Sequence, residues 1–270
     1  MRHIDKLARF PAVDAEPSFR MRVERDVPFS CPKDKPLFET AVSRTFAERD
    51  GRYTVYRGDH KTSMTYDASY TDVCLRLSPQ TPYEAVREYL AVLQCFSYHL
   101  LCIGGSLLHS AGVAVGEVGV ALVGRPQVGK STMAGRILRC EPTAEILCED
   151  APAVIKRDGR FWLCGTPFCG DDDACSARTV PLRGLVILEQ GAENRVTEVS
   201  SREAMFHLME AIPRPLYDGG ASEKAVALAM EWIDALPILK FENDGSDAAG
   251  ELLLRTLRSK GWFTERTTHL

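Results

Sequence analysis

The octapeptide at residues 124–131 constrains the fold of this chain more than any other feature of its sequence. It reads Gly-Arg-Pro-Gln-Val-Gly-Lys-Ser and matches the pattern Gly-x-x-x-x-Gly-Lys-Ser/Thr. The apolar run Val118–Val123 precedes it, and a segment of helical character follows from Lys130 to about Cys140. Because the pattern has its usual meaning only between a buried strand and a helix, the sequence predicts an α/β core around this loop.

Each part of the loop suits the binding of phosphate groups. Gly124 and Gly129 allow backbone N–H groups to turn inward, and the following helix adds the positive end of its dipole. Lys130 can reach the β- and γ-phosphates, and the Ser131 hydroxyl can bind Mg²⁺. We therefore expect ATP and Mg²⁺ as cofactors, held by Gly124, Arg125, Pro126, Gln127, Val128, Gly129, Lys130, Ser131 and Thr132. The alternative is an ordinary strand-to-helix turn with a surface lysine.

An acidic pair, Glu149 and Asp150, supplies the next candidate catalytic residues. The pair follows the apolar run Ile146–Cys148, about twenty residues after Lys130, which leaves room for one helix and a return connection. A triphosphate site needs a carboxylate for the metal and, in a kinase, a carboxylate that takes the hydroxyl proton. We expect Asp150 to join Ser131 at the metal, and either acidic residue to be the base. The alternative is a solvated pair of acids in a turn.

His109 is the third catalytic candidate. It lies in a segment, Leu107–Val115, that reads as the strand before the phosphate-loop strand. Strand alternation places Ala111 and Val113 on the face of His109, and we expect that face to look toward the phosphates. A histidine packed in the core is the alternative.

The rest of the chain predicts a small β-rich unit at residues 1–80 and an α/β domain at 81–270, with its core at about 101–215 and C-terminal helices at 216–270. A capping box, Thr81–Glu84, predicts a helix to about Ile103. Further expected elements are the strand Glu145–Cys148, a hairpin around Asp158–Gly159, the strand Gly184–Leu188, a helix capped by Ser200 through Ile212, and the helices Glu223–Ala235 and Ala248–Lys260.

Composition excludes several classes of partner. A formal charge of −4 and a pI near 5.9 give no general attraction to nucleic acid or to anionic membranes. The nine cysteines include no Cys-x-x-Cys pair, so neither a disulfide framework nor a zinc site is indicated. The first residues lack the apolar core of a signal peptide, and Tyr89–Ile103 is too short to span a bilayer. We expect a soluble, cytoplasmic protein. A homo-oligomer is one assembly that it could form.

Three segments together resemble the catalytic domain of the HPr kinase/phosphorylase family. They are Leu108–Val113, residues 124–131 and Cys148–Ala151, which occur in the family's order and at its spacing. The resemblance implies a fold similar to the nucleotide core of phosphoenolpyruvate carboxykinases. It also implies that His109 lies beside the phosphates or the metal. In the family an Asp-Asp pair supplies the base and a metal contact, and here Glu149 replaces the first aspartate.

The downstream segment departs from that family. Its Glu-Val-Arg-Gly-Leu-Gly type of signature is missing, and Gly165–Asp173 stands in this region. In this respect the chain resembles shorter HPr-kinase-like proteins found beside peptide-modification genes, some of which phosphorylate a serine of a precursor peptide. Gly165–Asp173 is either a substrate loop or a structural turn, and Asp171–Asp173 either bind a second metal or are simply solvated. Arg178 and Arg183 are further candidates for contacts with anions.

The expected function is that of an ATP-dependent phosphotransferase acting on a Ser or Thr hydroxyl of a peptide or protein. One alternative is a nucleotide-dependent peptide-binding or switch module with little phosphoryl transfer. A small-molecule kinase is another alternative, and the resemblance also allows a phosphorylase that uses inorganic phosphate in the reverse direction. ADP production that depends on a hydroxyl acceptor separates a kinase from a binding module.

Overall fold

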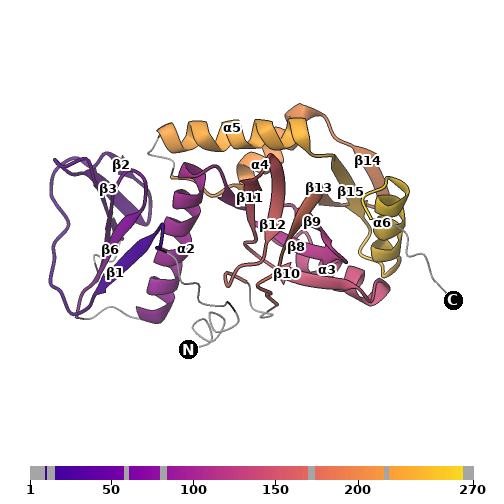
Figure 1. Cartoon of the computed structure of the whole chain (residues 1–270). Coiled ribbons are helices and arrows are strands. Elements are labelled where there is room, and N and C mark those ends of the chain that lie inside the picture. The colour runs from indigo at the N-terminus through magenta and orange to yellow at the C-terminus, as the bar shows by residue number, and fades with distance from the viewer. Residues whose placement is uncertain are drawn as a thin grey trace. The chain divides into compact units, whose positions relative to one another are not determined.

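The computed structural model describes residues 16–57, 61–79, 84–169, 174–215 and 219–263, together with Phe10. The chain divides into two compact units (Figure 1). The first unit comprises Ala12–Ile103 and Arg214–Lys224, and the second comprises Gly104–Pro213 and Ala225–Leu270. This division differs from the boundary expected at residue 80, because helix α2 (Glu84–Cys102) packs against the sheet of the first unit.

The first unit is a six-stranded sheet covered by α2. Its strands are β1 (Arg20–Glu24), β2 (Phe38–Glu39), β3 (Ser43–Ala47), β4 (Tyr53–Arg57), β5 (Thr62–Tyr66) and β6 (Asp72–Leu77), in the order β1-β6-β5-β4-β3-β2. The β1–β6 pair is parallel and the others are antiparallel. Tyr66 stacks on Tyr70 with ring centroids 4.8 Å apart, and Ala91 and Cys95 of α2 complete this core.

The β5–β6 turn is organised by Asp67. Its carboxylate accepts hydrogen bonds from the backbone N–H groups of Thr71 (2.7 Å) and Asp72 (2.9 Å) and from the Ser69 hydroxyl. Burial alone would raise the pKa of Asp67, but these hydrogen bonds outweigh it and lower the pKa to about 2. The carboxylate is therefore a structural part of the turn.

The second unit is a mixed α/β structure around a nine-stranded sheet. Its strands are β7 (Ser106–Leu107), β8 (Ser110–Val115), β9 (Val118–Val123), β10 (Ala144–Cys148), β11 (Ala153–Arg157), β12 (Arg160–Cys164), β13 (Thr179–Gln190), β14 (Arg195–Glu198) and β15 (Ile238–Asn243). The order is β10-β8-β9-β13-β12-β11-β7, with β15 pairing both β13 and β14. The β9–β13 and β13–β15 pairs are parallel.

Helices α3 (Lys130–Cys140), α4 (Ser201–Ala211) and α6 (Ala248–Ser259) belong to this unit, whereas α5 (Gly219–Ala235) has residues in both units. Helix α3 packs against α6, and Met133, Ile137 and Leu253 join the apolar side chains of β8, β9 and β13 in one core. This core fixes the start of α3 against the end of β9, where the candidate phosphate loop lies.

Several expected elements are present with little change. Strand β9 and helix α3 have the predicted bounds, and Ser200 caps α4 by accepting a hydrogen bond from the Glu203 N–H at 3.2 Å. The hairpin around Asp158–Gly159 forms with both residues at positive φ. Residues 81–83 of the predicted capping box lie outside the described residues.

Two expectations about strands were wrong. The expected strand Leu107–Val115 is two strands, because β7 pairs with β11 while β8 pairs with β9 and β10. The C-terminal segment is not purely helical, because β15 runs parallel to β13 and its side chains alternate between buried and half-buried.

All nine cysteines are free. Within the described part of the chain, no helix combines the length and the apolar character needed to cross a membrane.

Candidate functional site

The loop between β9 and α3 has a backbone that only particular residues can adopt. Gly129 lies at φ 98° and Gln127 at φ 65°, both in the left-handed region. A Cβ atom on Gly124 would lie 2.8 Å from Val128 Cγ1 and 2.9 Å from the Leu188 carbonyl oxygen. The Leu188 contact is with backbone, so a side chain at position 124 would displace the loop. The glycines of the motif are therefore explained by the geometry of the loop itself.

The N-terminus of α3 opens onto this loop without a side-chain cap. Gly129 is the N-cap residue and has no side chain to accept from the first N–H groups of the helix. Ser131 and Thr132 in the first turn are exposed, as are Arg125 and Pro126 in the loop. Uncapped N–H groups and the positive end of the helix dipole favour an anion at this position.

Lys130 is held across the mouth of the loop. Its ammonium Nζ donates to the Gly124 carbonyl at 2.9 Å and to the Arg125 carbonyl at 3.3 Å, and lies 3.2 Å from His109 Nε2. The residue is 8% exposed. Burial lowers the pKa of Lys130, and the Asp150 carboxylate opposes that shift. The ammonium is thus partly desolvated and has only weak neutral acceptors in the loop.

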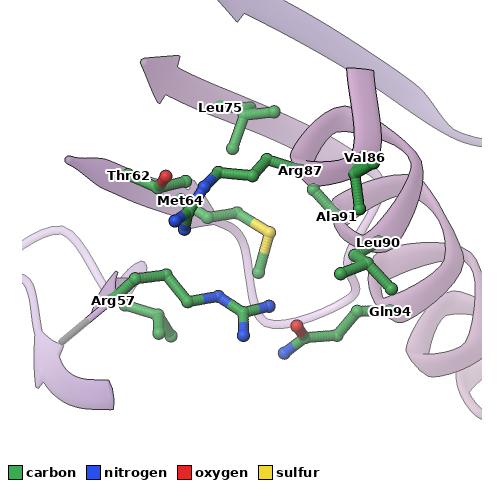
Figure 2. A pocket seen from close by; sticks show the side chains of 10 residues that line it. Arg57, Thr62, Met64, Leu75, Val86, Arg87, Leu90, Ala91 and Gln94 are labelled. Atoms are coloured by element: carbon green, nitrogen blue, oxygen red, sulfur yellow. The ribbon is translucent and has the colours of Figure 1, made fainter. Parts of the chain in front are cut away.

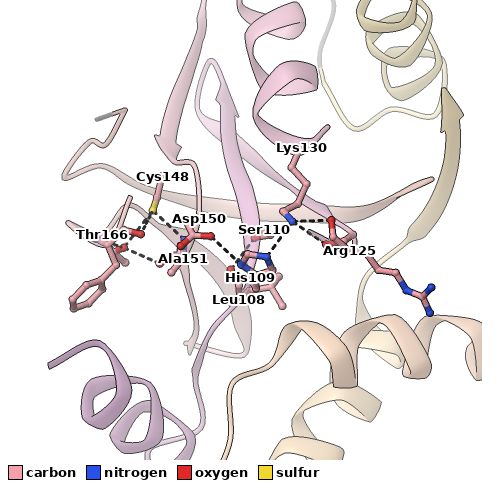
Figure 3. A network of polar contacts seen from close by, with 11 residues as sticks. Leu108, His109, Ser110, Arg125, Lys130, Cys148, Asp150, Ala151 and Thr166 are labelled. Carbon is pink, nitrogen blue, oxygen red and sulfur yellow. Dashed lines mark hydrogen bonds and ion pairs between the residues drawn. The ribbon is translucent and has the colours of Figure 1, made fainter. Parts of the chain in front are cut away.

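His109 connects this lysine to Asp150 (Figure 3). Its Nδ1 lies 2.9 Å from Asp150 Oδ1. Because an ammonium has only hydrogens to offer, His109 Nε2 accepts from Lys130, and Nδ1 carries the hydrogen given to Asp150. This hydrogen bond is the main cause that lowers the pKa of Asp150; burial opposes it, and the positive charge of Lys130 adds to it. Asp150 is therefore ionised at neutral pH.

Backbone hydrogen bonds fix His109 in the break between β7 and β8. Its N–H donates to the Ala211 carbonyl at 2.8 Å, and the Ser110 N–H donates to the Asp150 carbonyl at 3.1 Å. His109 is therefore not a strand residue, and strand alternation does not set its direction as the sequence suggested. The bond between Ser110 and Asp150 holds the imidazole and the carboxylate near each other.

Behind Asp150, a buried cluster anchors the end of β10. The Thr166 hydroxyl donates to the Ala151 carbonyl at 2.7 Å, and the Ala151 N–H donates to Cys148 Sγ at 3.4 Å. Burial raises the pKa of the Cys148 thiol, so the sulfur stays protonated. The described part of Gly165–Asp173 thus includes a structural anchor at Thr166, whereas Asp171–Asp173 lie outside the described residues.

Other predicted residues occupy different positions. Glu149 is 7% exposed, and the carboxylate that contacts His109 is that of Asp150. Arg178 binds Glu145 at 2.7 Å and the Gly116 carbonyl at 2.9 Å, so it is engaged with the β8–β9 turn and β10. Arg183 is exposed on β13.

Two cavities flank the loop. One has a volume of about 520 Å³ and is bounded by residues 125–128, by the end of β13 at Leu188–Gln190, and by Phe206 and His207 of α4. The other, about 330 Å³, is bounded by His109, Gly124, His207, Glu210 and Ala211, together with Arg125 and Pro126. Residues of the loop between β9 and α3 therefore border both cavities, and of the two only the second is bounded by His109.

The side chains of α4 at this site were missed by sequence reasoning. Phe206 is 52% exposed, and the Arg125 guanidinium lies 5.7 Å from the centre of its ring. Arg125 also pairs with Glu210 at 3.4 Å. The Ser200 cap correctly predicted the helix, but no local pattern indicates that its Phe206–Glu210 face meets the phosphate loop.

An acidic group near His207 is already paired with a lysine. Glu189, Glu203 and His207 bring their ligand atoms within 4.8 Å of one another. The Lys240 ammonium lies 2.8 Å from Glu203 and 3.8 Å from Glu189. This lysine supplies one positive charge beside the two carboxylates.

No family model matches the chain, and no curated protein matches its sequence. A solved structure, the HPr(Ser) kinase/phosphatase from Coxiella burnetii, is similar over 58% of this chain and 92% of that chain, with a TM-score of 0.34 and 10% identity.

Proposed function

We propose that this chain is an ATP-dependent phosphotransferase that moves a phosphoryl group from Mg-ATP to a seryl or threonyl hydroxyl of a peptide or protein. The observation that carries the proposal is the row of contacts from Lys130 through His109 to Asp150 beside the phosphate loop. A cation for phosphate and a carboxylate that can take the hydroxyl proton are groups that phosphoryl transfer uses, and here the imidazole orients the carboxylate.

The loop fits a triphosphate on its own geometry. Gly124 stands where any Cβ would collide with the backbone, and the first turn of α3 is uncapped. Lys130 exchanges its bonds to two loop carbonyls for bonds to phosphate oxygens, which are charged and therefore stronger acceptors. Ser131 and Asp150 would hold Mg²⁺. When bound, Mg-ATP supplies the phosphoryl group and a divalent charge that offsets the negative charge of the phosphates.

The two cavities would hold the acceptor and the nucleoside of ATP. His109 and Asp150 mark the reacting end, so the acceptor hydroxyl enters by the cavity that His109 bounds. The nucleoside then occupies the larger cavity on the β13 side, where the exposed ring of Phe206 offers a stacking surface.

In the transfer step the acceptor oxygen forms its bond to the γ-phosphorus as the bond to the β–γ bridging oxygen breaks. Asp150 takes the hydroxyl proton, and His109 keeps this carboxylate in place through Nδ1. Lys130 stabilises the charge that develops on the phosphoryl oxygens.

The test is transfer of labelled phosphate from ATP, with Mg²⁺, to a panel of peptides that contain serine or threonine, followed by mass spectrometry. We expect a mass gain of one phosphate and ADP formation that depends on the hydroxyl. Peptides with alanine at the acceptor position are the matched control. Nucleotide binding without any transfer would favour the peptide-binding switch module, and ADP formation without an acceptor would indicate a hydrolase.

A further inference from the structure

The first unit contains a cavity of its own, between its sheet and helix α2 (Figure 2). Its volume is about 300 Å³, which is at the lower end of the range for small-molecule sites. All of the described residues that bound it belong to the first unit, so it is a separate site from the phosphate loop.

One wall of the cavity is apolar. Val55, Met64 and Leu75 lie opposite one another on β4, β5 and β6, and strand alternation directs all three to the same face of the sheet. Ala91 and Leu90 of α2 face them across the cavity. The wall carries no charge, and Met64 is held by a 3.2 Å hydrogen bond from the Cys95 thiol.

The other end of the cavity is cationic. Arg57 ends β4 and Arg87 lies on the first turn of α2, and Figure 2 shows both guanidinium groups directed into the space between sheet and helix. No acidic side chain is among the described residues that bound the cavity. Two guanidinium groups at the end of an apolar cavity favour an anion with an apolar body.

A buried hydroxyl adds a third, independent observation. Thr62 is 4% exposed, and its Oγ1 has no hydrogen-bond partner among the described residues. It lies on β5 two positions from Met64, on the face that bounds the cavity. A buried hydroxyl without a partner is unfavourable, and an acceptor in the cavity would satisfy it.

We propose that this cavity binds a small carboxylate with an apolar body. The body lies along Met64, Leu75 and Ala91, and the carboxylate accepts hydrogen bonds from Arg57, Arg87 and the Thr62 hydroxyl. A volume of about 300 Å³ corresponds to about ten water-sized groups, which matches a chain of medium length.

Calorimetric titration of the full chain with octanoate, octanol and octylammonium tests the proposal without any nucleotide. We expect octanoate to bind with one site per chain, and octylammonium to bind at least tenfold more weakly because the arginines repel it. Arg57→Gln and Arg87→Gln should each weaken octanoate binding about tenfold. Arg44→Gln is the matched control, because Arg44 is an exposed, ion-paired residue of the same sheet.

Leu90→Glu provides a second variant that does not rely on the arginines. Leu90 is 41% exposed, so the substitution leaves the fold intact while it places a carboxylate at the cavity. We expect octanoate binding to be lost. The proposal is overturned if octanoate does not bind at millimolar concentration, if octylammonium binds equally well, or if Arg44→Gln weakens binding as much as Arg57→Gln.

Discussion

The ammonium group of Lys130 has neutral hydrogen-bond partners, which phosphate oxygens would replace in the proposed function. Its partners are two loop carbonyls and a neutral imidazole nitrogen, and its pKa is lowered by burial. None of these partners needs the lysine for its own position, because the loop is also fixed by Gly124 and by the packing of α3. Removal of the side chain should therefore affect phosphate binding far more than folding.

We predict that Lys130→Ala lowers nucleotide-dependent turnover at least about a thousandfold, the scale of a lost charge-stabilising group. Melting curves without nucleotide should agree with those of the wild type to within a few degrees. Lys156→Ala is the control, because Lys156 is a surface lysine paired with Glu231 in the same unit. Normal turnover by Lys130→Ala would remove the loop from the mechanism.

At His109 we predict a loss of turnover of about a hundredfold in His109→Ala, since the variant loses the group that positions Asp150. The pKa of Asp150 should also rise toward its ordinary value, because the hydrogen bond from His109 is the main cause of its lowering. Steady-state kinetics and a carboxyl titration by NMR measure the two effects. Turnover within fivefold of the wild type would assign His109 a packing role only.

The contribution of Asp67 to the free energy of unfolding should depend clearly on pH. Its folded pKa of about 2 is below the ordinary value of 3.8, so its stabilising effect is fully present above pH 3.8 and disappears as pH falls toward 2. We predict that Asp67→Asn lowers the free energy of unfolding by about 1 kcal/mol at pH 7, after allowance for solvent screening, and by much less at pH 2.5. Urea titrations at both pH values measure this. Asp34→Asn, at an exposed aspartate of the same unit, should show no such difference.

At the level of elements, the predicted bounds were most accurate where a motif fixes both the strand before it and the helix after it. Strand β9 and helix α3 have the expected bounds, because the glycine loop can join them in only one way. The run Leu107–Val115 is apolar except for His109 and Ser110, and at its break the N–H groups of Leu108 and His109 donate to the distant carbonyls of Pro152 and Ala211. Partners so far away in sequence leave no local signal.

The residues of the candidate site likewise fall into those that the sequence predicted and those that it did not. The segments that contain His109, Lys130 and Asp150 were expected to meet, and contacts join the three side chains in the structure. The contribution of Phe206 and His207 depends on how α4 packs beside the loop, which is a tertiary matter. The residues proposed to hold phosphate were thus accessible from the sequence, whereas those around the cavity proposed for the nucleoside were not.

Replacement of two glycines by alanine should have opposite effects on stability. A Cβ at Gly165 would lie 1.8 Å from the Ser176 carbonyl oxygen and 2.7 Å from that of Leu147, both of them backbone atoms. We predict that Gly165→Ala destabilises the second unit by about 3 kcal/mol or more. Gly135 lies within α3 with its nearest contact at 3.9 Å, so Gly135→Ala should stabilise by about 0.5–1 kcal/mol. Chemical denaturation of both variants gives the comparison, and equal effects would contradict the described packing.

At the level of the whole molecule, the three tryptophans, Trp162, Trp232 and Trp262, all belong to the second unit. Tryptophan fluorescence therefore reports on the unit that holds the phosphate loop. We predict that Mg-ATP raises the melting temperature followed by this signal, because a ligand that binds only the folded state stabilises it. The rise should be lost in Asp150→Asn, while ATP without Mg²⁺ serves as the control. An unchanged rise in Asp150→Asn would move the metal role to another carboxylate.

The first unit draws on two stretches of chain, because Arg214–Lys224 belongs with Ala12–Ile103 and Lys224 Nζ lies 3.6 Å from Cys102 Sγ. A ribosome must therefore make residues 104–213 before the first unit has all its parts. At about 5–20 residues per second, that interval lasts roughly 5 to 20 seconds. During this time the nascent sheet and α2 lack their last segment, although the first unit is still completed before the second unit, which also needs Ala225–Leu270.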